Sequence, residues 1–300
     1  AKLFSVMKSG LNLLLIAFIF LFVSATTSCT KESDQGSQNN GTLRDTTILN
    51  VSYGLDTYNV YDLYLPEGRD SNTPVVLIIH GGAWKAGQKE DMNSYIKQLR
   101  NSWPEAAVVN MNYRLASNAK NIHHNDMMQD IKSVIDHVLS NKEKYQISSK
   151  FGVAGASAGG HLAMIYAYKY DKKKNIQCVG NFFGPSNLAD WSWYNSNNLF
   201  LGANVGDVLS EYVGQPWEST LYQGVSPYWT VTSSSQPTII FHGTLDPIVP
   251  VQQSQLLKNK LNSLNVPNEY HEYLAFHGFD ATQTTDVIAK MVAFFKKHMK

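Results

Sequence analysis

The stretch Phe151-Gly-Val-Ala-Gly-Ala-Ser157-Ala-Gly-Gly-His161 places a serine between an apolar strand pattern and an apolar helix pattern. The residues before Gly155 are small or apolar, and those from Leu162 to Tyr168 are apolar on nearly all sides. A serine at such a sharp strand-to-helix turn has a strained backbone, and only small neighbours such as Gly155 and Gly159 avoid collisions there. The turn should therefore expose the Ser157 hydroxyl and direct helix N–H groups toward negative charge that develops beside it.

Strand and helix patterns alternate along the chain on both sides of this stretch. Short apolar runs indicate strands, and apolar residues at i, i+3 and i+4 indicate helices, one of which follows a cap at Asn125. The predicted strands are 48–53, 60–65, 74–80, 106–111, 151–154, 178–183, 238–241 and 269–274, with the first two antiparallel. The predicted helices include 127–138, 257–264 and 287–295. This alternation predicts an α/β fold with a mostly parallel central sheet, helices on both faces and a ligand at the carboxyl ends of the strands.

The composition of the 300 residues excludes several classes of protein. There are 25 Lys and Arg against 24 Asp and Glu, so the net charge of +1 offers no basic face for nucleic acid. Two cysteines are too few for a disulfide framework or a four-cysteine zinc site. An apolar fraction of 43% is ample for a packed core. We therefore expect a globular protein with no nucleic-acid partner.

The N-terminal residues have the pattern of an export signal. Two lysines precede the apolar run Leu13–Val23, which would span about 16 Å as a helix against a hydrocarbon core of about 30 Å. A run this short predicts a signal peptide over 1–28 and not a membrane span. The residues before Cys29 resemble the lipobox of bacterial lipoproteins, with Ser28 in the expected position and Thr26 where leucine is usual.

This resemblance implies that Cys29 is acylated and that the protein is exported and attached to a membrane through a lipid anchor. Residues 29–45 are predicted to form a flexible tether, because Ser, Asn, Gln and Gly dominate most of this segment. Residues 46–300 are predicted to form the folded domain. The alternative is an ordinary secreted protein that is cut nearby and keeps Cys29 as a free thiol.

A serine hydroxyl needs a base to take its proton, and His277 is the strongest candidate among the nine histidines. It follows the predicted strand 269–274, on a loop that should lie at the carboxyl edge of the sheet. By contrast, His161 lies one turn into the helix after Ser157 and is predicted to pack there.

A carboxylate should orient the imidazole and stabilise its protonated form, and Asp246 follows the strand 238–241 at the same edge of the sheet. The rival carboxylates are Asp190, Asp207 and Asp280. The order Ser157, Asp246, His277 along the chain is the order found in sheet-based serine hydrolases.

Two glycines follow the first long strand in the stretch His80-Gly81-Gly82-Ala83-Trp84. Glycines allow a close approach of the backbone to a ligand and can turn N–H groups toward it. We predict that the amides of Gly82 or Ala83, together with that of Ala158, form an oxyanion hole. The alternative is a glycine turn beside a buried histidine.

An aromatic-rich insertion, residues 186–236, interrupts the alternation of strands and helices. An insertion this long in a compact domain is usually functional, for example as a lid, but it can equally be a small helical flap packed on the sheet edge. Trp84, Trp191 and Trp193 are predicted to contact the substrate.

Taken together, the motifs resemble those of the α/β-hydrolase fold. They are His80-Gly-Gly-Ala-Trp84, Asn112-Tyr-Arg-Leu115, Gly155-Ala-Ser-Ala-Gly-Gly-His161, Ser226-Pro227, His242-Gly-Thr-Leu-Asp-Pro-Ile-Val-Pro250 and Phe276-His-Gly-Phe279. More narrowly, they are similar to carboxylesterases and to acetyl-xylan or feruloyl esterases related to hormone-sensitive lipase. The resemblance covers about residues 48–296 and implies Ser157, Asp246 and His277 as a catalytic triad with no metal or organic cofactor.

Two positions depart from the pattern of that group. Ala83 stands where the lipase-like branch has a third glycine, which favours the His-Gly-Gly-X-Trp branch that also contains kynurenine-formamidase-like amidases. Ala156 stands where an acidic residue often precedes the nucleophile. Arg114 is predicted to pair with Asp130 and not to touch substrate.

The sequence therefore predicts a serine esterase that acts on a small-molecule or carbohydrate ester, removing acetyl or feruloyl groups. An amidase, a formamidase or a peptidase of the same fold is the alternative. A non-catalytic carbohydrate-binding lipoprotein on a hydrolase scaffold is the remote alternative.

Overall fold

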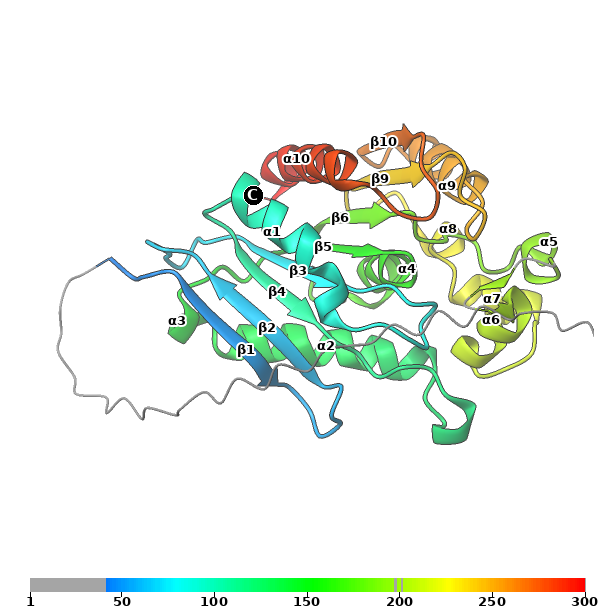
Figure 1. The fold of residues 1–300 in the computed structure, drawn as a ribbon, viewed down its shortest axis with the longest axis horizontal. Helices are drawn as coiled ribbons and strands as arrows, with labels where there is room; N and C mark the ends of the chain where they lie inside the picture. Colours follow the sequence, from blue (N-terminus) through cyan, green and yellow to red (C-terminus); the bar gives the residue numbers. More distant parts are fainter. Residues whose placement is uncertain (1–41, 197–198, 201, 300) are drawn as a thin grey trace, which may run out of the picture. The chain divides into compact units, whose positions relative to one another are not determined.

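The computed structural model describes residues 42–196, 199–200 and 202–299 (Figure 1). The predicted signal peptide, Cys29 and most of the predicted tether lie outside the described residues. Before residue 46 the chain already contacts the domain, since the Gly68 amide donates to the Leu43 carbonyl and Asp45 pairs with Arg100 at 2.8 Å. None of the helices described has both the length and the apolar character needed to cross a membrane.

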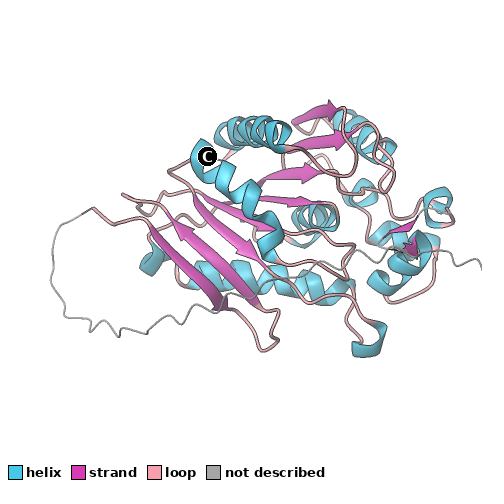
Figure 2. Cartoon of the chain, in the orientation of Figure 1, coloured by secondary structure: helices cyan, strands magenta, loops and turns pink. Residues whose placement is uncertain are grey.

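An eight-stranded, mostly parallel sheet forms the centre of the domain, as predicted (Figure 2). The strand order is β1-β2-β4-β3-β5-β6-β9-β10, in which β1 pairs antiparallel with β2, β2 pairs antiparallel with β4, and all later pairs are parallel. The strands are β1 (Thr46–Ser52), β2 (Val60–Leu65), β3 (Val75–Ile79), β4 (Ala107–Met111), β5 (Phe151–Ala156), β6 (Ile176–Phe182), β9 (Thr238–Gly243) and β10 (Asn268–Tyr273). Their parallel part brings the carboxyl ends of β3, β5, β6, β9 and β10 to one edge.

Helices cover both faces of the sheet, and alternate strand residues face the two layers. Val76 and Ile78 belong to a core cluster with α1 (Asn93–Ser102) and α10 (Ala281–His298), which lie side by side (Figure 1). Leu77 belongs to the cluster on the other face, with α2 (His124–Ser140), α4 (Ala158–Ile165) and α9 (Gln252–Ser263). Shorter helical elements are η1 (Lys89–Met92), η2 (Asn118–Lys120), α3 (Lys142–Tyr145) and the π-helical turn η3 (Tyr166–Tyr170).

The helix expected after Asn125 begins earlier. Its first residue is His124, because the Asp126 side chain accepts the backbone N–H of His123 at 3.0 Å and makes His123 the N-cap. Since Asp126 reaches back by three residues, it satisfies an N–H group that would otherwise be unpaired at the start of the helix.

The described residues of the range 186–236, hereafter the cap segment, form small helices and one short ribbon. These are α5 (Trp191–Tyr194), β7 (Leu199–Phe200), β8 (Ala203–Asn204), α6 (Val205–Val213), α7 (Ser219–Gly224) and α8 (Pro227–Thr230). Leu209, Tyr212 and Tyr222 are fully buried and belong to the same core cluster as α2 and α4. The described part of the cap segment is therefore packed into the domain.

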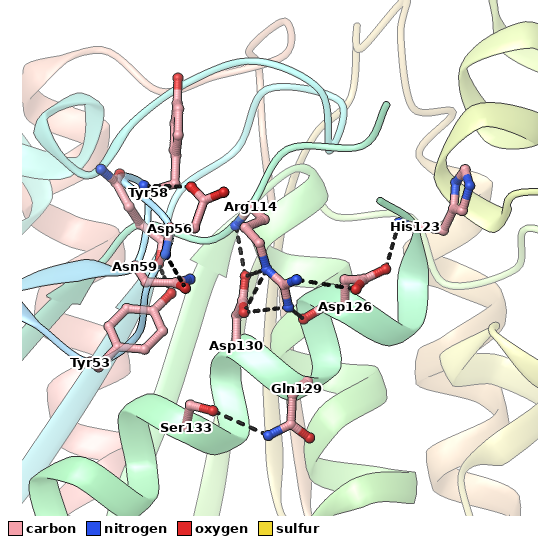
Figure 3. A network of polar contacts seen from close by, with 11 residues as sticks. Tyr53, Asp56, Tyr58, Asn59, Arg114, His123, Asp126, Gln129, Asp130 and Ser133 are labelled. Atoms are coloured by element: carbon pink, nitrogen blue, oxygen red, sulfur yellow. Dashed lines mark hydrogen bonds and ion pairs between the residues drawn. The ribbon is translucent and has the colours of Figure 1, made fainter. Parts of the chain in front are cut away.

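Arg114 joins the chain after β4 to α2 through an ion-pair network (Figure 3). Its guanidinium contacts Asp130 at 2.8 Å and Asp126 at 3.2 Å, and its backbone amide also donates to Asp130. Hydrogen bonding to buried Asp130 is the main reason why the Arg114 pKa is raised, with burial acting in the opposite direction. The predicted Arg114–Asp130 ion pair is confirmed, and it fixes a loop whose Ala116 amide donates to the Trp84 carbonyl at 2.9 Å.

Candidate active site

Ser157 lies at the tight turn between β5 and α4. Its φ of 54° and ψ of −120° are strained for any residue with a side chain. A Cβ atom on Gly155 would overlap the backbone of Gly159, and a Cβ atom on Gly159 would overlap the carbonyl group of Ile79. The two glycines thus let the turn pack directly against β3, which holds Ser157 at the carboxyl edge of the sheet.

The structure brings together the three residues predicted from the sequence as nucleophile, base and orienting carboxylate. Nε2 of His277 lies 2.8 Å from Oγ of Ser157, and Nδ1 of His277 lies 2.6 Å from Oδ2 of Asp246. The three side chains follow β5, β10 and β9, respectively. Both distances are hydrogen-bond distances, so a proton can pass from the serine hydroxyl to an imidazole whose other nitrogen is already bonded.

The side chain of Asp246 is buried and has a hydrogen-bond donor at each oxygen. Oδ1 accepts the backbone amides of Ile248 at 2.9 Å and Val249 at 3.0 Å, while Oδ2 faces His277 and also lies 3.3 Å from Nε2 of His242. Burial by itself would raise the pKa of Asp246, but the hydrogen bonds from His242, His277 and the Ile248 amide outweigh it and hold the pKa well below its usual range. The carboxylate is therefore ionised and fixed in orientation.

His242 is a second histidine beside Asp246, and its sequence context predicted no role for it. It is fully buried at the end of β9, with Nδ1 at 2.6 Å from Oγ of Ser254 and Nε2 at 2.9 Å from the Val249 carbonyl. Because Nε2 faces a carbonyl and a carboxylate, the hydrogen-bond partners assign the proton to Nε2. Its spacing of four residues from Asp246, across a turn at a strand end, is the sequence signal that could have identified it.

The loop that carries His277 crosses the ends of two strands. A Cβ atom on Gly243, at the end of β9, would overlap the Phe276 carbonyl, so the loop runs directly over that strand end. Phe183 follows β6, and its ring meets the His277 imidazole edge to face at a centroid distance of 4.9 Å. The His277 side chain remains slightly exposed, as a base that must meet a substrate requires.

Residues His80–Trp84, hereafter the glycine loop, lie beside Ser157. A Cβ atom on Gly81 would lie 3.3 Å from Cβ of Ser157, so the two segments are in contact. Positive φ angles follow one another at Gly82 (109°), Ala83 (52°) and Trp84 (60°). Within the described ranges no residue accepts a hydrogen bond from the amide of Gly82 or Ala83. Ala158 is the first residue of α4, where an amide has no partner inside its own helix. Unpaired N–H groups beside the serine are what an oxyanion hole requires.

His80 itself is a buried structural residue. Its ring stacks on Tyr113 at 4.3 Å, and Nδ1 lies 2.7 Å from the Gly81 carbonyl. Burial lowers the pKa of His80 to about 4, so the imidazole is neutral at physiological pH. The two interpretations of this stretch are therefore compatible: the glycine turn lies beside a buried histidine, and it also approaches Ser157 closely.

Two of the three tryptophans predicted to contact the substrate cannot do so in this structure. Trp84 has no exposed surface, because its ring stacks on Tyr212. Trp193 is also buried, and its Nε1 donates to the Ile248 carbonyl at 3.1 Å, next to the turn of Asp246. Both predictions are wrong: the two rings pack inside the protein. Trp191 is 52% exposed and stacks on Tyr194, so it stays a candidate.

The comparison with protein families gives one match of substantial length. The model of the BD-FAE family matches residues 61–261, which is more than half of the chain. This range includes Ser157 and Asp246 and ends before His277.

Among curated proteins, the chain is 24% identical over 248 residues to an esterase, LipC, of Mycobacterium tuberculosis, covering 77% of this chain and 59% of that protein. It is 25% identical over 181 residues to a kynurenine formamidase of Danio rerio, covering 58% of this chain and 52% of that protein. The chain thus spans little more than half the length of these relatives.

Solved structures share the fold. A truncated carbohydrate esterase from gut microbiota superimposes with a TM-score of 0.70 at 24% identity, covering 84% of this chain and 95% of that one. An esterase of the Planctomycetes species Thermogutta terrifontis gives a TM-score of 0.64 at 22% identity, covering 85% and 93%. The fold is that of the α/β hydrolases.

Proposed function

The chain belongs to the BD-FAE family, and on that premise we propose that it is a serine hydrolase that cleaves carboxylic esters. The observation that carries the proposal is the continuous hydrogen-bonded path from the Ser157 hydroxyl through His277 to Asp246. Esterases among the relatives, such as LipC, lend further support.

Acylation would begin when Oγ of Ser157 attacks the ester carbonyl carbon and its proton moves to Nε2 of His277. The carbonyl electron pair moves onto oxygen, where the amides of Ala158 and of Gly82 or Ala83 would stabilise the negative charge. Asp246 stabilises the imidazolium that forms. The intermediate then expels the alcohol, which takes the proton from His277.

Deacylation would repeat these steps with water. The oxygen of a water molecule attacks the acyl carbon while His277 takes one of the water protons. His277 then gives that proton to Oγ of Ser157 as the bond between the acyl group and the enzyme breaks. The products are a carboxylic acid and the free serine. The scheme uses only side chains and backbone amides of this chain and one water molecule.

For the substrate, we propose an acylated carbohydrate that bears acetyl or feruloyl groups. Trp191 offers an exposed indole face on the cap segment, and aromatic faces are surfaces on which sugar rings can stack. A carbohydrate esterase among the solved structures has the same fold. The second candidate is an amidase or formamidase, favoured by the His-Gly-Gly-Ala-Trp stretch and by the formamidase relative.

The test is a comparison of substrates combined with active-site labelling. We expect hydrolysis of p-nitrophenyl acetate and of acetylated or feruloylated oligosaccharides, and labelling of Ser157 by a fluorophosphonate probe, located by peptide mass spectrometry. Faster turnover of N-formylkynurenine than of any ester would favour the amidase. Absence of both labelling and hydrolysis would support the non-catalytic carbohydrate-binding protein instead.

We also propose that the protein is exported and anchored through acylated Cys29, for which the lipobox-like sequence before Cys29 is the support. In a bacterial host, radiolabelled palmitate should be incorporated into the full chain, which should partition into detergent. Cys29→Ser should abolish the labelling and leave the protein in the aqueous phase. An unlabelled wild-type chain in the aqueous phase would contradict the anchor.

A further inference from the structure

Three buried rings connect the glycine loop, the helix after Ser157 and the cap segment. Trp84 and Tyr212 stack with centroids 4.5 Å apart and planes 21° apart. The ring of His161 is nearly perpendicular to both, with its centroid 5.3 Å from that of Trp84 and 5.4 Å from that of Tyr212. All three side chains have no exposed surface, so we call Trp84, His161 and Tyr212 the three-ring cluster.

Directed hydrogen bonds fix the orientation of these rings. Nε1 of Trp84 donates to Nδ1 of His161 at 3.3 Å, and Nε2 of His161 faces the Val225 carbonyl of the cap segment at 2.8 Å. Burial lowers the pKa of His161 to about 4, so the imidazole is neutral at neutral pH. Because Nε2 faces a carbonyl, the partners assign the proton to Nε2 and leave Nδ1 to accept from Trp84. The Tyr212 hydroxyl is hydrogen bonded to Nδ1 of His124 on α2.

Glu211, the residue before Tyr212, also contacts the chain beside the glycine loop, although it is not part of the three-ring cluster. The Glu211 side chain pairs with Lys85, which directly follows the glycine loop, and it also accepts the Asn118 amide at 3.3 Å. The Glu211 carbonyl lies 2.8 Å from Nδ1 of His123. The last turn of α6 therefore holds both the glycine loop and the chain that runs from η2 to α2.

The glycine loop needs external support because its backbone is strained. Ala83 and Trp84 have side chains and yet adopt left-handed φ angles of 52° and 60°. Such conformations are unfavourable for residues with a Cβ atom and persist only where the surroundings hold them. The Ala83 amide, a candidate oxyanion donor, is adjacent to Trp84, and the Ala158 amide lies three residues before His161 on α4.

We propose that Tyr212 is a positioning residue for the oxyanion hole, which it holds in shape through Trp84. On this proposal, which rests on the proposed esterase function, the cap segment is a structural part of the catalytic apparatus and not a cover that lifts away. The stack on Trp84 transmits the effect, and the Tyr212 hydroxyl contributes less because it points toward α2.

The test uses the full chain with p-nitrophenyl acetate. Tyr212→Leu fills most of the space but removes the stack, and we expect kcat to fall about 10- to 100-fold with little change in KM, since small displacements of catalytic groups have effects of this order. Tyr212→Phe keeps the ring and should retain kcat within a few-fold. The Ki of a trifluoromethyl ketone, whose adduct places an oxyanion in the hole, should rise in Tyr212→Leu in parallel with the loss of kcat/KM.

Tyr222→Leu is the matched control, because Tyr222 is equally buried in the cap segment but contacts Tyr194 and Trp217. It should lower the melting temperature without changing kcat. Wild-type kcat in folded Tyr212→Leu, or an equal loss in Tyr222→Leu, would overturn the proposal. If Tyr212→Leu does not fold, Trp84→Leu removes the other ring of the same stack, and a kcat as high as wild type in folded Trp84→Leu would then contradict the proposal. A wild-type chain inactive on every ester would refute the esterase function itself.

Discussion

Ser157→Ala should lower kcat for p-nitrophenyl acetate by roughly 10⁴- to 10⁶-fold, the range seen when a triad nucleophile is removed. Alanine lacks the oxygen that attacks the carbonyl carbon, so the acyl-enzyme cannot form. His277, Asp246 and the glycine loop keep their places in this variant, and a small residual rate is therefore expected. The rate is measured from the release of p-nitrophenolate. The enzyme concentration must be high enough to detect the small residual rate.

Ser186→Ala is the matched control for this experiment. Ser186 is also a buried serine, and its hydroxyl donates to the Gln253 carbonyl at 2.6 Å, remote in role from the reacting atoms. Losing that hydrogen bond should cost about 1 kcal/mol of folding stability and leave kcat near that of the wild type. Ester hydrolysis by Ser157→Ala at a rate close to that of the Ser186→Ala variant would rule out the nucleophile assignment.

Asp246→Asn should lower kcat by about 10³- to 10⁴-fold while leaving the fold intact. Two backbone amides, those of Ile248 and Val249, hold the oxygen at the Oδ1 position. The amide oxygen of asparagine would take that position, so its NH₂ group would face His277 and His242. His277 would then have to accept at Nδ1 and carry its proton on Nε2, the nitrogen that must take the proton from Ser157.

The matched control is Asp280→Asn, which changes a rival carboxylate close to His277 in sequence. Asp280 caps α10 by accepting the Gln283 amide at 2.8 Å, and asparagine caps helices about as well as aspartate. Asp280→Asn should therefore match the wild type in kcat and in melting temperature. Comparable losses in the two variants, with both proteins folded, would mean that Asp246 has no special part in the reaction.

Much of the fold follows from local sequence patterns. The predicted strand 60–65 coincides with β2, and the strands predicted at 74–80 and 238–241 differ from β3 and β9 by two residues or fewer at each end. Buried apolar runs mark such strands because both of their faces are covered. The strand order could not be predicted, since which strands become neighbours depends on long-range packing. For residues 186–236 a small helical flap was one of two interpretations, but the bounds of its helices could not be predicted, because each is too short for a periodic pattern to stand out.

The candidate triad could be found because strand ends and chain order constrain where its members lie. The environment of Trp84 could not be predicted. Tyr212, which stacks on its ring, lies 128 residues later in the chain, and nothing in the sequence around Trp84 indicates that contact. The predicted contact of Trp84 with substrate therefore did not anticipate that its ring is buried. The second histidine on Asp246 was missed for a related reason, since His242 meets the carboxylate only after the turn has folded.

The route of the loop that carries His277 sets a limit on its length. His277 follows β10, but Ser157 follows β5, and two strands lie between them in the sheet. With neighbouring strands about 4.8 Å apart, the loop must recover roughly 14 Å of lateral distance, and it does so by running over Gly243 and past Phe183. A deletion between Tyr273 and His277 would shorten that reach directly. Changes of chain length over evolution should therefore be rare here and accumulate at surface turns whose ends already lie close together.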